Sequence, residues 1–229
     1  MAALLSALAL SPTASAVEPR PGDGGPQPII GGGYAQNAPW AARLFSGGQQ
    51  TCTSTIISPT WILTAKHCVS GGNLAFRIGS LDQGSGGTVA NGVQTVTSPS
   101  ADLALVRLDR SVSATYARLG QPGTVRVGQT VQVYGWGATC TDKPEIECQS
   151  QLLKVAKVSV SSIDCPDGAA GVSVCANRGD GITAGGDSGG PMYAGGKQVG
   201  VASTSDRQSY TAYINITKYR DWISSTAGV

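Results

Sequence analysis

The sequence predicts an all-β fold made of many short strands, and two observations carry that prediction. The 229 residues include 32 glycines and 12 prolines, and only 13% of them are charged, a composition that favours turns and short strands over long helices. Short apolar runs also recur along the chain and are broken by Gly, Pro, Ser and Asn, which is the pattern of strands joined by turns. The length is enough for one large domain or two small ones.

The expected elements follow from these runs. The last stretch, 217–225, places Tyr219, Trp222 and Ile223 at positions i, i+3 and i+4, which predicts a short amphipathic helix that closes the fold. The expected strands of the first half are 53–57, 61–64, 76–78, 93–97 and 103–108.

The N-terminal stretch has features of a secretion signal. Residues 2–10 form an apolar run that is too short to span a bilayer, and Ala14-Ser15-Ala16 is a small-x-small site that suits cleavage after Ala16. The positive charge that usually precedes such a run is missing, which leaves open a start further upstream or a plain unstructured terminus. We expect residues 1–16 to be a signal, truncated at its start, and the mature protein to be secreted and extracellular.

Charge and cysteine content narrow the possible partners. The net charge of +2 gives no basic field suited to nucleic acid, and no later segment is long and apolar enough to cross a membrane. Six cysteines in an exported chain predict three disulfides, and fifteen pairings are possible. None of them shows the C-x-x-C spacing of a structural zinc site, so we expect no metal and no cofactor.

The motif G-G-D-S-G-G-P at 185–191 is the most informative stretch of the chain. Glycines let the backbone adopt positive φ and bring N–H groups close to a substrate, and an oxyanion hole needs such N–H groups beside a nucleophile. The motif therefore favours Ser188 as a nucleophile over an incidental serine in a Gly-rich turn. Asp187, directly before it, needs a cation nearby.

An abrupt apolar pair suggests where that cation comes from. Residues 17–28 are rich in Pro and Gly and predict an accessible pro-segment. The motif I-I-G-G at 29–32 comes next and is either an ordinary first strand or a new N-terminus released by cleavage after Pro28. In the second interpretation, the α-amine of Ile29 is positive at neutral pH and can pair with Asp187.

Two further residues complete a candidate set. His67 is the only histidine of the chain and follows a strand in the motif T-A-K-H-C. Asp102 stands at the head of an apolar strand in D-L-A-L. Each has a structural alternative, since a lone histidine is more often structural and a strand-end aspartate is more often solvated.

Taken together, these motifs resemble the chymotrypsin/trypsin-like serine peptidases. T-A-K-H-C, D-L-A-L, G-W-G at 135–137 and G-D-S-G-G-P occur in the order of that family, and I-I-G-G resembles its mature N-terminus. The resemblance covers about 29–229. It implies two packed antiparallel six-stranded β-barrels, with an active site in the cleft between them. The implied barrels are 29–116 and 124–229, the linker is 117–123, and the strands of the second barrel are 130–134, 152–160, 191–193, 199–203 and 210–214.

The resemblance also implies a role for each site residue. His67 is the general base and then the general acid, Asp102 orients it, and Ser188 is the nucleophile. The N–H groups of Gly186 and Ser188 form the oxyanion hole, and Ser203 supports Asp102. The implied disulfides are Cys52–Cys68 and Cys165–Cys175, which leaves Cys140–Cys148.

The specificity pocket departs from the trypsin pattern. Ile182 occupies the position where trypsin-like members carry an aspartate for basic substrates, and a basic side chain would be desolvated there without a partner. By the same matching, Ser205 and Thr211 narrow the slot, Thr183 lies beside Ile182, and Thr204 replaces a common aromatic residue. Small or medium apolar side chains are expected in this pocket. Asp206 and Arg207 either face water or bring Asp206 toward the pocket.

The sequence therefore predicts a secreted serine endopeptidase, made as a zymogen and activated by cleavage before Ile29. The expected protein is a monomer that acts on protein or peptide substrates and can meet protein protease inhibitors. The alternative is a non-catalytic binding protein on the same fold. Asn215-Ile216-Thr217 also fits a glycosylation sequon.

Overall fold

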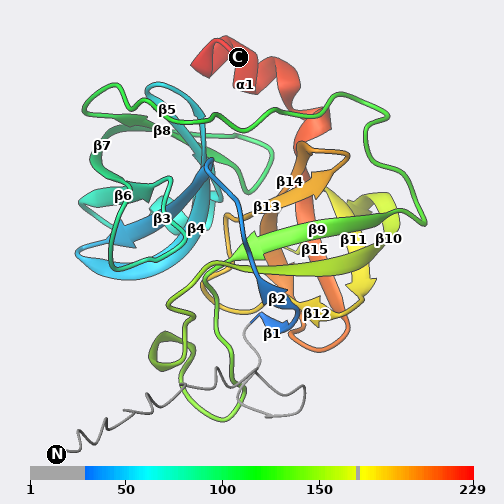
Figure 1. The fold of residues 1–229 in the computed structure, drawn as a ribbon. Coiled ribbons are helices and arrows are strands. Elements are labelled where there is room, and N and C mark those ends of the chain that lie inside the picture. The colour runs from blue at the N-terminus through cyan, green and yellow to red at the C-terminus, as the bar shows by residue number, and fades with distance from the viewer. Residues whose placement is uncertain (1–28, 169–170) are drawn as a thin grey trace, which may run out of the picture.

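The computed structural model describes residues 29–168 and 171–229, and its first barrel is built from the N-terminal half (Figure 1). Six antiparallel strands close on themselves in the order β3-β4-β5-β8-β7-β6. Their bounds are β3 (Ala41–Ser46), β4 (Gln49–Ser58), β5 (Trp61–Thr64), β6 (Leu74–Ile78), β7 (Thr88–Thr97) and β8 (Ala104–Leu108).

The second barrel is formed by the C-terminal half, also from antiparallel strands. The order is β11-β15-β14-β13-β9-β10, and a pairing of β11 with β10 closes the ring. Its strands are β9 (Thr130–Gly135), β10 (Lys154–Pro166), β11 (Val172–Arg178), β13 (Pro191–Ala194), β14 (Lys197–Ser205) and β15 (Tyr210–Asn215). The predicted fold of two six-stranded antiparallel barrels is confirmed.

Three very short strands tie the start of the described chain to the second barrel. β1 (Ile30–Gly31) pairs with β12 (Gly181–Ile182), and β2 (Gly33–Tyr34) adds to β10. β1 therefore lies beside the segment that leads into the Ser188 loop. The predicted signal and pro-segment, 1–16 and 17–28, lie outside the described residues.

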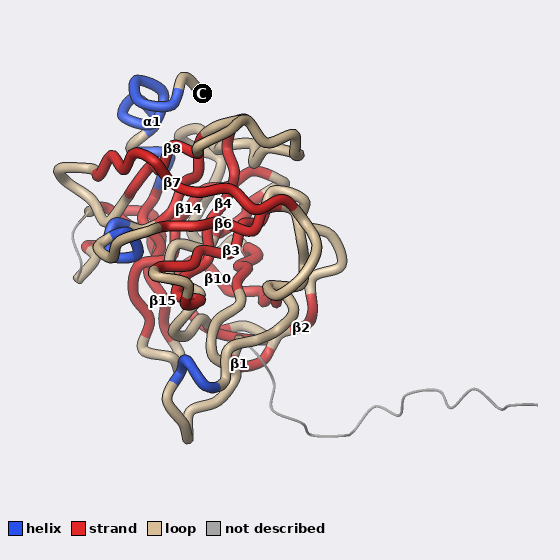
Figure 2. The backbone as a smooth tube through the Cα atoms, turned by 90° about the vertical axis from the view of Figure 1, so that its left-hand side faces the viewer, coloured by secondary structure: helices blue, strands red, loops and turns tan. Residues whose placement is uncertain are grey.

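The C-terminal helix covers one end of the first barrel. After the 3₁₀ turn η3 (Ile216–Lys218), α1 (Arg220–Ala227) begins three residues later than predicted, and Figure 2 shows it next to β8. Ile223 is fully buried, and Tyr219 and Trp222 are partly buried against the same core, so the predicted apolar face is correct. No helix within the described ranges combines the length and the apolar character that a membrane crossing needs.

The seam between the barrels is filled by side chains from both of them. Trp40 of the first half stacks on Tyr193 with ring centroids 4.3 Å apart, and its edge meets Tyr134 at 5.0 Å. The core of the first barrel also includes Val201 and Ile214 from the second. Because apolar contacts run across the seam, the position of one barrel relative to the other is fixed by packing.

The end of β15 bears on the sequon at Asn215, whose glycosylation the sequence leaves open. Asn215 is 1% exposed, and its amide donates to the Ile163 carbonyl at 2.7 Å. Its Oδ1 accepts the hydroxyl of Thr217 at 2.7 Å. The sequon is thus part of the folded interior and is not a surface site for a glycan.

Candidate active site

His67 and Asp102 come together at the seam, although 35 positions separate them in the sequence. His67 lies in the 3₁₀ turn η1 (Lys66–Val69), directly after β5, and the disulfide Cys52–Cys68 ties that turn to β4. The Nδ1 atom of His67 is 2.7 Å from Oδ2 of Asp102, and the His67 backbone N–H donates to Oδ1 at 2.9 Å. The ring is thereby held in one orientation with its other nitrogen turned away from the carboxylate.

Asp102 is 3% exposed and accepts a third hydrogen bond, since the Ser203 hydroxyl donates to Oδ2 at 2.7 Å. Burial by itself raises the pKa of Asp102, but hydrogen bonds from His67 and Ser203 outweigh it and hold the pKa below the usual value. Asp102 is therefore a carboxylate at neutral pH and favours the His67 tautomer that carries its proton on Nδ1.

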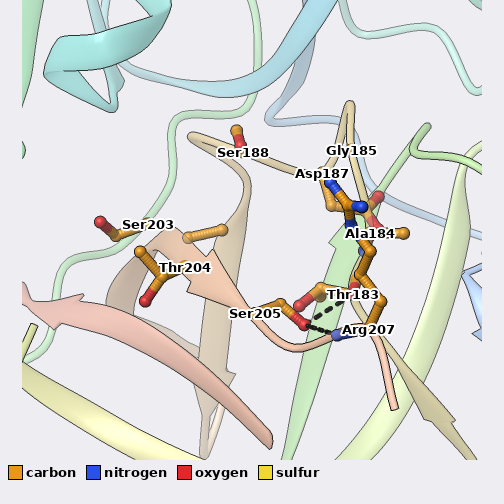
Figure 3. Close-up of a pocket in the computed structure, with 10 residues that line it drawn as sticks. Thr183, Ala184, Gly185, Asp187, Ser188, Ser203, Thr204, Ser205 and Arg207 are labelled. Atoms are coloured by element: carbon orange, nitrogen blue, oxygen red, sulfur yellow. Dashed lines mark hydrogen bonds between the residues drawn. The ribbon is translucent and has the colours of Figure 1, made fainter. Parts of the chain in front are cut away.

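Ser188 is half-buried at one end of a cavity (Figure 3). Its backbone is fixed from the first barrel, because the N–H of Thr53 donates to the Ser188 carbonyl at 2.9 Å. The next turn is fixed from the second barrel, where the N–H of Gly189 donates to the Ala202 carbonyl at 2.8 Å. The hydroxyl is thus presented from a loop that both barrels hold in place.

The backbone N–H groups of Gly186 and of Ser188 itself are free to bind a ligand. The Gly185 carbonyl accepts the N–H of Ala138 at 2.7 Å. In a trans peptide the next N–H points the opposite way, so the N–H of Gly186 is directed away from Ala138. Within the described parts of the chain, neither this group nor the N–H of Ser188 donates a hydrogen bond to another residue. Gly186 has a φ of +97°, which favours glycine.

Asp187 is completely buried, and it contributes to the cavity lining beside Ser188. Its carboxylate accepts the N–H groups of Gly137 at 2.7 Å and of Ala184 at 2.9 Å. A side chain at Gly137 would overlap this carboxylate, which explains the second glycine of the G-W-G motif. Burial raises the pKa of Asp187 to about 7, and neither these two hydrogen bonds nor the attraction of Arg43 offsets it.

Within the described part of the chain, the hydrogen bonds to the Asp187 carboxylate come from Gly137 and Ala184 and not from Ile29. The side chain of Ile29 is nonetheless fully buried, in the core of the second barrel. Its backbone has a φ of 36°, in the left-handed region where a β-branched residue is strained.

Arg43 is a residue of this region that the sequence analysis missed. It is fully buried on β3, and its Nη1 donates to the carbonyls of Cys52 and Gly186, both at 3.2 Å. Its Nη2 donates to Oε1 of Gln149. Burial lowers the pKa of Arg43 to about 9, with Asp187 acting in the opposite direction. The only signal in the sequence is one arginine within an apolar strand.

The cavity below Ser188 has a volume of about 260 Å³. Of the predicted pocket residues, Thr183, Ser203, Thr204 and Ser205 line it, together with Ala184, Gly185, Asp187, Ser188, Ala202 and Arg207. The Ser205 hydroxyl donates to the Thr183 carbonyl at 2.8 Å, and Figure 3 shows these two residues at the end opposite Ser188. The slot is therefore short and carries hydroxyl groups at its base.

Two predicted lining residues lie behind the cavity wall instead. Thr211 is buried and its Oγ1 is 2.7 Å from Oγ1 of Thr183. Ile182 is fully buried in β12, opposite Ile30 of β1. Neither residue belongs to the described lining of the cavity.

The two charged residues after Ser205 are both exposed, as the first sequence interpretation expected, but Arg207 also lines the cavity. Asp206 does not approach the pocket, because its Oδ1 accepts the N–H groups of Gln208, Ser209 and Tyr210, each at 2.8 Å. Arg207 does not simply face water. It lines the cavity, and its Nε is 2.8 Å from Oε1 of Glu145.

The three disulfides are those expected. They join Cys52 to Cys68, Cys140 to Cys148 and Cys165 to Cys175. His67 and the first pair form the one described cluster of possible metal ligands, but sulfurs that are bonded to each other offer no thiolate to a metal.

With this geometry established, the chain can be compared with known proteins. A profile of the trypsin family matches residues 29–223. The chain belongs to the trypsin family. This trypsin-family protein is 32% identical to brachyurin of Leptuca pugilator, with 88% of the chain and 99% of brachyurin covered. It is 31% identical to trypsin alpha of Drosophila erecta, with 87% of each covered.

The trypsin-family protein is also similar to a bacterial peptidase and to two solved structures. An uncharacterized peptidase of Corynebacterium glutamicum is 31% identical over 79% of this chain, which spans 66% of that relative. Among solved structures, mouse neuropsin, a serine protease, superposes with a TM-score of 0.74 at 25% identity, over 86% of this chain and 98% of neuropsin. Human heparin binding protein gives a TM-score of 0.74 at 25% identity, over 86% and 96%.

Proposed function

We propose that this trypsin-family protein is a secreted serine endopeptidase that works through Ser188, His67 and Asp102. The observation that carries the proposal is the orientation of His67, whose Nδ1 is held by a buried, doubly supported Asp102. Such an imidazole presents its second nitrogen as a base, which a serine hydroxyl needs to become a nucleophile.

The proposed reaction follows the established template for this triad. His67 takes the proton of Ser188 as its oxygen attacks the substrate carbonyl, and the resulting oxyanion accepts the N–H groups of Gly186 and Ser188. His67 then gives the proton to the leaving amine, which leaves an acyl-enzyme. Water, deprotonated by His67, releases the acid and restores Ser188.

The substrate backbone has a place to bind beside this site. Ser203, Thr204 and Ser205 form the end of β14, where the pairing with β13 has already stopped at Val201. An extended peptide can add there as a strand. Protein and peptide substrates are therefore the proposed partners, and protein inhibitors that present an extended loop would use the same edge.

The cavity favours small or medium apolar side chains before the scissile bond. Ser205 and Thr183 close its base, and Ile182 and Thr211 are buried outside its described lining. A substrate lysine or arginine would meet the guanidinium of Arg207 instead of a carboxylate, which opposes trypsin-like specificity.

Activation is proposed to follow cleavage before Ile29. In the uncleaved chain, Asp187 is buried with a raised pKa, and Ile29 has a strained backbone. A free α-amine at Ile29 would remove the restraint on that φ angle and supply a cationic partner for Asp187. We therefore propose that the precursor is a zymogen and that the processed form acts as a monomer outside the cell.

The test is covalent labelling by a fluorophosphonate that reacts with activated serines. We expect a single adduct on Ser188 in the form processed before Ile29, slow labelling of the uncleaved chain, and none in Ser188→Ala. Absence of the adduct from the processed form would favour the alternative, a non-catalytic binding protein. Equal labelling rates in the two forms would refute the zymogen step alone.

A further inference from the structure

The loop closed by Cys140–Cys148 contacts two residues of the cavity lining, Gly185 and Arg207. It contains the 3₁₀ turn η2 (Glu145–Glu147). Oε1 of Glu145 accepts the N–H of Gly185 at 3.0 Å and lies 2.8 Å from Nε of Arg207. Nη2 of Arg207 donates to the other oxygen, Oε2, at 3.1 Å. One carboxylate thus joins the loop, the nucleophile motif and the turn after β14.

Gly185 is held on both sides as a result. Glu145 binds its N–H, and the N–H of Ala138 binds its carbonyl at 2.7 Å. The peptide between Gly185 and Gly186 carries the N–H of Gly186 on its other side. Two consecutive glycines impose little conformational preference of their own, so the direction of that N–H depends on these external contacts.

The carboxylate lies against the backbone without a gap. A Cβ atom at Gly185 would overlap the carboxylate of Glu145. The glycine at this position therefore permits the contact between the acid and the main chain.

Arg207 is fixed in its place by its own turn. Its φ is +64°, which is uncommon for a residue other than glycine. The Arg207 N–H donates to the Ser205 hydroxyl at 3.0 Å, and Asp206 accepts three further N–H groups of the turn. The guanidinium is thus directed at Glu145 by a backbone conformation that several hydrogen bonds maintain.

We infer that Glu145 is a positioning residue that aims the N–H of Gly186 at the substrate oxyanion, with Arg207 as its support. The inference rests on the proposed function, in which that N–H stabilises the tetrahedral intermediate. The ion pair is partly exposed, with 56% of the Arg207 side chain and 29% of the Glu145 side chain accessible. Pairs of this kind add little to stability, so removing the contact should leave the fold intact.

The first experiment compares Glu145→Ala with Glu147→Ala in the processed form. Glu147 lies in the same turn and is exposed, and its side chain makes no hydrogen bond or ion pair within the described chain. We expect Glu145→Ala to lower kcat roughly 10-fold, less than the 10²–10³-fold lost when an oxyanion donor is removed outright. Glu147→Ala should match the parent, and both variants should keep the parent's Tm within about 2 °C.

A pair of inhibitors separates positioning from ordinary pocket binding. A peptide aldehyde forms a tetrahedral adduct with an oxyanion, whereas the corresponding peptide amide binds without one. In Glu145→Ala, the Ki of the aldehyde should rise roughly 10-fold, in line with kcat, and the Ki of the amide should stay unchanged. In Glu145→Gln, the amide oxygen can still accept the N–H of Gly185, so most of the aldehyde affinity should return.

Two outcomes would overturn the inference. One is equal aldehyde affinity in Glu145→Ala and Glu147→Ala. The other is an equal loss for aldehyde and amide, which would indicate a damaged pocket. If the parent itself proves inactive, the proposed function fails, and amide hydrogen exchange still tests the contact between Glu145 and Gly185. Exchange of the Gly185 N–H should accelerate in Glu145→Ala but not in Glu147→Ala. Unchanged exchange in Glu145→Ala would refute the contact.

Discussion

Asp102 illustrates how much of the site depends on a single buried charge. Three hydrogen bonds converge on its carboxylate, two from His67 and one from Ser203. Only the contact with Ser203 can be removed without changing either His67 or Asp102. Substitutions at Ser203 and at Asp102 therefore test two effects separately: the support of the Asp102 carboxylate and the orientation of the His67 ring.

Replacing Ser203 with alanine should lower kcat about 10-fold, because a hydrogen bond to a charged group contributes about 1.5–3 kcal/mol. Asp102→Asn should lower kcat far more, about 10⁴-fold as in the family template, because an amide favours the wrong tautomer of His67. Steady-state kinetics on a peptide ester measures both values. A Ser203→Ala enzyme as fast as the parent would show that Ser203 does not support Asp102.

Asp187 should make the stability of the uncleaved chain depend on pH. Its folded pKa of about 7 lies above the ordinary value of 3.8, so the folded state retains a proton that the unfolded state releases. The free energy of unfolding should therefore fall as the pH rises from about 4 to about 7. Arg43, whose pKa is about 9, stays charged throughout this range.

Urea unfolding at several pH values, in a Ser188→Ala background that prevents self-digestion, measures this dependence. The slope should flatten in Asp187→Asn, which cannot titrate. It should also be smaller in the processed form, where the α-amine of Ile29 is proposed to pair with Asp187. A slope that is the same in all three proteins would exclude Asp187 as its source.

Single residues also show where sequence reasoning ends. His67, Asp102 and Ser188 could be proposed because each lies in a short motif. Arg43 and Glu145 could not, because their partners are distant: Arg43 binds the Gly186 carbonyl 143 positions away, and Glu145 binds the N–H of Gly185, 40 positions away. Only the folded backbone brings these groups into contact.

At the level of elements, the predicted strands are those with a clear apolar run. Residues 61–64 match β5 in full, whereas β3 and β11 were missed. β3 is buried along four consecutive residues, including Arg43, and β11 along four. Strands covered on both faces lose the alternation that identifies a half-exposed strand. β10 extends to Pro166, past the predicted end at 160. Its pairing with β11 continues there through two register shifts.

Ile223 should hold α1 to the first barrel. It is the fully buried residue of that helix, so Ile223→Ala should lower the free energy of unfolding by about 3 kcal/mol through lost burial and a cavity. Ser224→Ala, at the exposed neighbouring position, should stay within about 0.5 kcal/mol of the parent. Denaturant titration compares them, and equal stability would mean that the helix is not docked in solution.

At the scale of the whole molecule, the two barrels meet across a buried arginine. Arg43 comes from the first barrel, and its partners Gly186 and Gln149 belong to the second half of the chain. The sequence predicted two barrels only through the family resemblance, since strand patterns alone do not say how sheets close. The residues that join the barrels follow from no local pattern.

Arg43→Met keeps the length of the side chain but removes its charge and its donors. It should lower the free energy of unfolding by about 3 kcal/mol, because the Cys52 carbonyl loses its donor and Asp187 loses a nearby cation. Arg126→Met is the matched control, since Arg126 is exposed and its side chain makes no hydrogen bond or ion pair within the described ranges. If both variants unfold at the same urea concentration, the arginine does not fasten the barrels.

The amide at the end of β15 has a consequence for producing the protein. Asn215 donates its side-chain nitrogen to the Ile163 carbonyl inside the fold, and that nitrogen is the atom to which an oligosaccharide would be joined. Attachment and native folding therefore exclude each other. In a host with a glycosylating secretory pathway, sugar-bearing molecules would form a misfolded fraction, and Asn215→Gln would not be a harmless way to avoid them.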